Sequence, residues 1–352
     1  MMSINKYDRL PRAGDTEDES GIKVFYLAPR PVPMGVKVYS ARHLHQEANE
    51  VYLDFALNSA NIEFSARAFI SAIITIISLF FLIAVGLGID GYFRFQKSFS
   101  ETFGALVLSN WFMWITLIIL STAYSYLFLN AVYQLSTTTP IRFNRQRREV
   151  AYVAKRGQPP RFIPWEEVIA CVSSSIVPTE YGSQQKFALM IGLVDASDGQ
   201  VMWLTVPAFT LGMAVSEWEA IRAYMEEGPD ALPKPMMGDT PEQGTVGFFH
   251  MCRRDYLIDH GYLRYFFGFL LIQFCSGWTL PCHIATWVER LPKTAFPKSV
   301  QNWSKPLPRD QWQSPSAELI AQSEEVRKSF RKGMDIFEHF REKENNPSKT
   351  RG

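Results

Sequence analysis

The sequence predicts an α+β membrane protein, in which a transmembrane helical hairpin, with a candidate third helix, carries a small β-rich cytosolic domain closed by a helix. Two observations carry this prediction. Long apolar runs lack Asp, Glu, Lys and Arg, and other stretches are short apolar segments bounded by turn residues, as strands are. The formal net charge of +1 gives no overall field that would attract nucleic acid.

The hairpin is predicted over residues 65–136. No charged residue occurs between Ala68 and Ile89, and none occurs between Thr102 and Ile141, where the apolar centre is 111–133. A helix needs roughly 20 apolar residues to cross the hydrocarbon core of a bilayer. Both runs are long enough, so we expect spans at 68–89 and 111–133.

The distribution of Lys and Arg predicts the orientation of this hairpin. The link at 90–101 carries Arg94 and Lys97, whereas residues 142–161 carry seven basic residues against one acid, Glu149. Basic residues concentrate on the cytoplasmic side of membrane proteins. We therefore expect a multi-pass protein of the bacterial inner membrane with residues 137–228 in the cytoplasm.

A third membrane segment is predicted at 262–288. No residue from Tyr265 to Val288 carries a full charge, but Gln273 and Pro281 interrupt the apolar pattern. Proline removes a backbone hydrogen bond, which is costly in lipid. A full span, which would place the tail outside, is our leading interpretation; a re-entrant or interfacial segment and a buried helix of the soluble part stay open.

The other segments are assigned from their patterns. Prolines among apolar residues predict an extended N-terminal arm at 1–64, with a disordered acidic stretch at 15–19. A Pro-rich linker is expected at 229–261. The tail, 289–352, contains an amphipathic helix at 315–344, whose apolar side would pack on the protein's own domain or dock on lipid or a partner.

The domain at 137–228 matches the pleckstrin-homology-like plan of antiparallel strands closed by one helix. Trp165 is expected to anchor its core. The closing helix is expected at 213–227, ended by Gly228. Five or six strand candidates are visible where that fold has seven, among them 141–144, 150–153, 187–194 and 201–206.

No motif for catalysis or cofactor binding is visible, and we expect no catalytic, cofactor or metal site. The spans lack charged groups through their centres, which disfavours transport. The candidate lipid or partner surface is the basic cluster after the second span, consisting of Arg142, Arg145, Arg147, Arg148, Lys155 and Arg156. Alternatively, this cluster only sets the topology as a solvated face.

Two motifs resemble a family of bacterial inner-membrane proteins catalogued as a domain of unknown function. They are the R-F-N-R-x-R-R strand, here Arg142 to Arg148, and the P-W-E-E segment, here Pro164 to Glu167, which follow a membrane hairpin. The resemblance covers roughly residues 50–290, and members often occur beside type VI secretion effectors. It implies a non-enzymatic immunity or accessory protein that binds a secreted toxin. The alternative is a membrane-anchored scaffold whose cytosolic domain binds a protein or anionic lipid.

Overall fold

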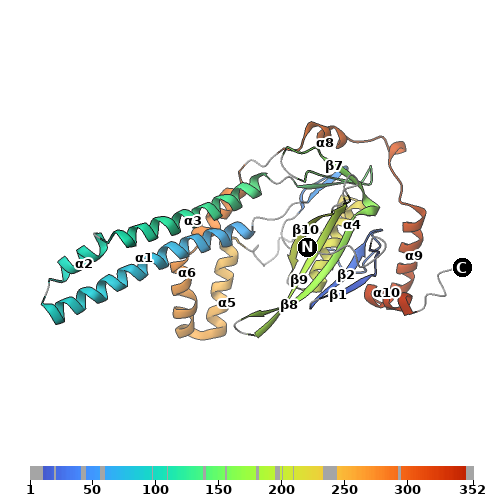
Figure 1. Cartoon of the computed structure of the whole chain (residues 1–352). Helices are drawn as coiled ribbons and strands as arrows, with labels where there is room; N and C mark the ends of the chain where they lie inside the picture. Colours follow the sequence, from blue (N-terminus) through green and yellow to red (C-terminus); the bar gives the residue numbers. More distant parts are fainter. Residues whose placement is uncertain are drawn as a thin grey trace. The chain divides into compact units, whose positions relative to one another are not determined.

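The computed structural model describes residues 11–19, 21–40, 45–55, 60–96, 98–108, 110–137, 140–154, 157–179, 182–194, 199, 201–208, 210–232, 244–291 and 295–345. The chain forms two compact units (Figure 1). Unit 1 combines Met1–Leu57, Thr139–Met237 and Ala295–Gly352, and unit 2 combines Asn58–Thr138 and Gly238–Thr294. Each unit is therefore built from segments that are far apart in the sequence.

Unit 1 contains two antiparallel sheets of five strands. The strand order of the first sheet is β1-β2-β8-β9-β10, and that of the second is β3-β4-β5-β6-β7. The strands are β1 (Thr16–Glu19), β2 (Ile22–Ala28), β3 (His45–Ala48), β4 (Tyr52–Phe55), β5 (Ile141–Asn144), β6 (Glu149–Tyr152), β7 (Arg161–Pro164), β8 (Ile169–Thr179), β9 (Gly182–Val194) and β10 (Val201–Ala208).

Helix α4 (Leu211–Glu227) closes the core of unit 1. The Thr210 side chain accepts a hydrogen bond from the Met213 amide at the start of the helix, and Gly228, with φ +104°, ends it. Trp218 on α4 packs against Trp165, with ring centroids 5.3 Å apart, and both rings are fully buried. The predicted closing helix and the predicted core anchor are confirmed, although Trp165 lies in a 3₁₀ helix (Trp165–Glu167) and not in a strand.

Before α1 (Ala60–Phe95), the described residues of the predicted N-terminal arm are extended, but they form paired strands of unit 1 and not a separate arm. β2 pairs with β8, and β4 pairs with β5 across the whole membrane hairpin. The acidic stretch that we expected to be disordered forms the edge strand β1, which pairs with β2. Strand pairing supplies hydrogen-bond partners from distant residues, and a local pattern does not reveal such partners.

From Ala295 onward the tail is part of unit 1, and its described residues form the helices α8 (Lys298–Trp303), α9 (Ala317–Arg331) and α10 (Ile336–Asn345). The single helix predicted at 315–344 is interrupted at Gly333, whose φ of +83° is left-handed. The Phe337 ring on α10 lies 4.6 Å from the Phe25 ring on β2. The apolar side of the tail therefore packs on the protein's own core, the first of the alternatives that the sequence left open.

Unit 2 contains two helices that are long and apolar enough to cross a membrane, in α1 (Ala60–Phe95) and α3 (Trp111–Thr137). A short helix, α2 (Phe99–Leu108), which we did not predict, joins them. In each long helix, only 6% of the most apolar stretch of 18 residues is buried. Such exposure of leucine, isoleucine and phenylalanine is typical of helices that lie in lipid. The two predicted spans are thus confirmed as candidate membrane-spanning helices.

The rest of unit 2 comprises α5 (Val246–Arg264), a π-helix (Tyr265–Leu270), α6 (Leu271–Cys275) and α7 (Leu280–Glu289). The linker predicted at 229–261 is wrong where the structure describes it from Val246, because α5 begins there. Helical geometry breaks at Gly261, with φ +72°. The stretch Val246–Cys275 and the helix Leu280–Val288 meet at a bend of 44° and count as a third candidate span only if they form one span.

Candidate functional site

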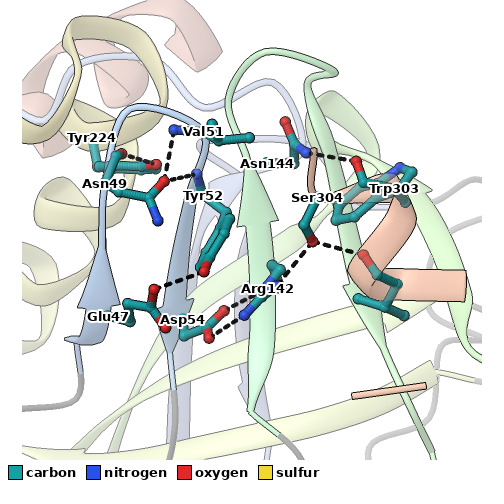
Figure 2. A network of polar contacts seen from close by, with 11 residues as sticks. Glu47, Asn49, Val51, Tyr52, Asp54, Arg142, Asn144, Tyr224, Trp303 and Ser304 are labelled. Carbon is teal, nitrogen blue, oxygen red and sulfur yellow. Dashed lines mark hydrogen bonds and ion pairs between the residues drawn. The ribbon is translucent and has the colours of Figure 1, made fainter. Parts of the chain in front are cut away.

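The predicted basic cluster lies on β5 and on the turn that follows, and it begins with Arg142. Figure 2 shows the Arg142 guanidinium facing Asp54 on the neighbouring strand β4, with both N–O distances 2.6 Å. A third nitrogen donates to the Ser304 hydroxyl at 2.9 Å. The Tyr52 ring centroid lies 3.6 Å from the guanidinium carbon. Arg142 is thus a buried cation with a paired anion on one side and an aromatic face on another.

The electrostatics of this pair follow from its burial. Burial alone lowers the pKa of Arg142, but the hydrogen bonds and negative charge of Asp54 outweigh it, so the pKa of Arg142 is raised and the side chain stays charged. Burial raises the pKa of Asp54, and Arg142 opposes that rise. A buried, mutually satisfied pair of this kind holds two strands in register.

The next residues of the R-F-N-R-x-R-R motif tie the C-terminal segment to the turn. The Asn144 side chain accepts from the backbone amides of residues 146 and 147, both at 3.1 Å. The Gln146 side chain accepts from the Leu307 amide at 2.7 Å, and the Arg147 guanidinium donates to the Trp303 carbonyl at 2.9 Å. These side chains therefore act as connectors between chain segments.

Arg148 joins the motif to the P-W-E-E segment. Its guanidinium donates to both carboxylate oxygens of Glu226 at 2.9 Å and to Glu166 at 3.3 Å. The Trp165 indole also donates to Glu226, at 3.0 Å. The two motifs that carried the family resemblance thus meet in one ion-pair cluster.

Within the described stretch 142–148, the arginines do not form the free basic surface, or the solvated face, that we expected. Arg142 and Arg148 are buried, and Arg145 is half-buried beside Glu50 at 3.2 Å. Lys155 and Arg156 lie outside the described residues. The sequence prediction failed because the carboxylates that neutralise these arginines lie about 20 to 95 residues away in the chain.

A groove of about 980 Å³ is the candidate binding site of unit 1. Five parts of the chain line it: the N-terminal turn, the segment 29–32, the P-W-E-E segment, the end of β9 at Val194 and the pair α9–α10. Its lining carries both signs of charge beside apolar side chains, including Arg12, Asp15, Arg30, Val32, Glu167, Glu325, Val326, His339, Phe340 and Lys343. Sequence reasoning missed this groove, because its lining comes from parts of the chain that are far apart in the sequence.

A second cavity, of about 550 Å³, shares Glu166 and Glu167 with the groove. Glu166 accepts hydrogen bonds from the backbone and hydroxyl of Ser316, the N-cap of α9, in addition to its contact with Arg148. Glu167 is exposed and faces both cavities. The first carboxylate of the P-W-E-E segment therefore positions α9, and the second is available to a ligand.

His339, on α10, lines the groove and has a pKa below the ordinary value of histidine. Its Nδ1 lies 2.8 Å from the Ser329 hydroxyl on α9. Burial lowers the pKa of His339, with Glu325 and Glu342 opposing this effect and Lys343 adding to it. The imidazole is therefore neutral at pH 7 and serves as a hydrogen-bonding contact between the two helices.

The described residues contain no group of three metal-ligating side chains. Cys171, on β8, is free and fully buried, and burial raises the pKa of its thiol to about 12. A thiol with such a pKa is a packing group, because the reactive thiolate does not form at neutral pH.

Comparison with known proteins returns one family. The model of a family of unknown function (DUF6708) matches residues 117–315, which is more than half of the chain. The matched range begins within α3 and includes most of that helix, the arginine cluster, the P-W-E-E segment and α4 to α8. No curated protein and no solved structure matches the chain.

Proposed function

The chain belongs to the DUF6708 family of unknown function, and from this premise we propose that it is a non-enzymatic, membrane-anchored protein that binds another protein through the groove of unit 1. Its partner is a toxin delivered by a type VI secretion system, which it neutralises as an immunity or accessory protein. The membrane is the bacterial inner membrane, and unit 1 lies on the cytoplasmic side. The excess of basic residues after α3 supports this orientation.

The domain plan that we propose is pleckstrin-homology-like, with the membrane hairpin inserted after the first strand. β4, β5, β6 and β7 are consecutive neighbours in one sheet, and β8, β9 and β10 are consecutive neighbours in the other. The helix α4 follows directly. These seven strands and one helix support the proposed plan, and β4 could not be counted in the sequence of the domain because it precedes the hairpin.

The observation that carries the binding proposal is the composition of the groove wall. Segments from before the hairpin, after it and near the C-terminus all contribute to that wall. Its mixed charges and apolar side chains fit an extended protein segment that carries charges of both signs. A domain tethered to the membrane also gains effective concentration against a toxin that acts there.

Co-expression with a candidate toxin tests the proposal. The full chain should rescue growth, and the Glu167→Lys variant should lose much of that rescue because it reverses the charge of an exposed groove residue. The matched control is Lys186→Glu, a charge reversal at an exposed position on β9 that does not line the groove. Killing that is unchanged by the full chain would reject that toxin as the partner. Equal rescue by both variants would reject the groove.

The alternative function is a membrane-anchored scaffold. The groove supports a scaffold that binds a protein, but the arginines do not support one that binds anionic lipid. Arg142 and Arg148 already have carboxylate partners, so a lipid head group would have to break buried ion pairs to reach them. The scaffold alternative predicts a partner other than a toxin at the same groove.

A further inference from the structure

We infer that residues 246–275 form an interfacial helical hairpin, which inserts into one leaflet of the bilayer and does not cross it. All three segments of unit 1, including the C-terminal helices, then lie on the same side of the membrane.

The first argument is that unit 1 is built from three separate segments of the chain. β4 pairs with β5 across the first membrane insertion, with Tyr52 opposite Asn144. Across the second insertion, Ser304 bonds to Arg142, and the Trp303 indole donates to Glu149 at 2.8 Å. A unit of open sheets cannot be divided by a bilayer, because only helices and closed barrels satisfy their backbone groups in lipid.

Because all three segments belong to one unit, the number of times that the chain can cross the membrane is restricted. Each of the two excursions from unit 1, at 58–138 and at 238–294, must cross the membrane an even number of times. The first does so with α1 and α3. The described residues of the second, 244–291, contain at most one candidate span. A single crossing would place the C-terminal helices on the opposite side of the membrane from the core of unit 1, against which they pack. The second excursion therefore does not cross the membrane.

The second argument is that the chain reverses at Gly261. Phe249 and Phe269 have ring centroids 5.8 Å apart, and Tyr256 lies 5.5 Å from the same Phe269 ring. In one straight helix, residues 249 and 269 would be about 30 Å apart. At Gly268, a Cβ would lie 2.4 Å from the Tyr256 hydroxyl, so the two arms approach each other closely at this position. Each arm, about 22 Å long, is shorter than the hydrocarbon core of about 30 Å.

The third argument is the position of the two ends of this hairpin. Arg67, in the second turn of α1, donates to the Gln273 side chain at 2.6 Å and to the Trp278 carbonyl at 3.2 Å. Its guanidinium carbon also lies 5.6 Å from the Phe249 ring centroid, near the start of the other arm. Both ends therefore lie beside the beginning of the candidate span Ile62–Phe95, where α1 enters the bilayer.

The fourth argument is the difference between the two arms. The first arm carries charged residues that are exposed, among them Arg253, Arg254, Asp255 and Asp259. The second exposes apolar side chains, among them Phe266, Phe267, Leu271, Ile272 and Phe274. In Figure 1, α6 and α5 stand side by side, and α6 is the nearer of the two to the end at which α1 meets α2. A polar arm and an apolar arm fit the boundary between head groups and acyl chains.

Single-cysteine labelling of the full chain in sealed membranes tests the crossing number. The four native cysteines are replaced by alanine, and one cysteine is introduced at Lys186, at Lys298 or at Ser98, all exposed positions. A membrane-impermeant maleimide should label the first two from the same face and Ser98→Cys from the other. If Lys298→Cys labels from the face of Ser98→Cys, the inference is overturned. A side-specific reporter fused after Gly352 of the unsubstituted chain must give the same answer.

Depth-dependent fluorescence quenching tests the contact with lipid. A fluorophore at Leu263→Cys, near the reversal, should be quenched more by lipids labelled near the head group than by lipids labelled at the chain end. The control is Ile119→Cys on α3, where we expect the opposite order. Quenching at Leu263 by neither lipid, or mainly by chain-end labels, would overturn the inference.

Discussion

The two units of this protein place their side chains by opposite rules. Unit 1 buries charge, since Arg142 and Arg148 are only 7% and 8% exposed. Unit 2 exposes apolar groups, since Phe93 and Phe274 are 77% and 70% exposed. Each choice is costly in water unless partners or lipid compensate for it. Unit 1 therefore neutralises its buried charges with internal ion pairs, whereas the exposed apolar side chains of unit 2 depend on the surrounding solvent.

The largest effect is expected from Arg142→Ala, which tests whether the buried ion pairs stabilise unit 1. It leaves Asp54 buried without its cation, which costs about 3–5 kcal/mol in the free energy of unfolding. Thermal unfolding of the full chain in detergent measures this loss. The control Lys186→Ala, at an exposed site, should stay within about 0.5 kcal/mol of the parent. Equal stability of the two variants would contradict the structural role of Arg142.

The substitution Ile119→Arg, near the middle of α3, tests whether unit 2 lies in lipid. A charge in lipid at this depth costs about 2.5–3.5 kcal/mol. Ile176→Arg on β8 is the matched variant, because Ile119 and Ile176 are 60% and 65% exposed. We expect the first to reduce the membrane-inserted fraction and the second to leave it unchanged, as measured by membrane fractionation and protease protection. Equal effects would mean that α3 is not surrounded by lipid.

A smaller effect is expected from Ser316→Ala. The Ser316 hydroxyl accepts a hydrogen bond from the Leu319 amide and also bonds to Glu166. Its loss should cost about 1 kcal/mol and loosen α9 in hydrogen–deuterium exchange. Ser316→Asp keeps the cap oxygen but faces Glu166, so it separates the cap from the carboxylate contact. Unchanged exchange in Ser316→Ala would show that α9 is held by its apolar packing alone.

The smallest effect is a dependence on pH through His339. Burial lowers the pKa of His339 below its ordinary value of 6.5, so the unfolded chain binds a proton before the folded chain does. The stability that this group contributes is complete above about pH 6.5 and is lost as the pH falls toward the lowered pKa. His339→Asn should flatten this part of the unfolding curve between pH 7.5 and 5.5. The same slope in both proteins would exclude His339 as the titrating group.

Elements with a local signal were predicted. β5 and α4 lie where their patterns indicated, and the two spans follow from the length of each apolar run. β2 and β4 were missed because their partners, β8 and β5, are supplied by distant parts of the chain. The groove was missed for the same reason. A hint for the Arg142 pair existed, since Asp54 lies in an apolar stretch, but nothing local joined it to an arginine 88 residues later.

The sequence by itself determined which stretches avoid water, because hydrophobicity and helix length are properties of adjacent residues. Only the tertiary structure decided that the arginines are internal connectors, because the net charge of a site depends on carboxylates brought from other segments. It also decided that the stretches on either side of residues 58–138 and 238–294 form one core, because strand pairing and packing act through space and not along the chain.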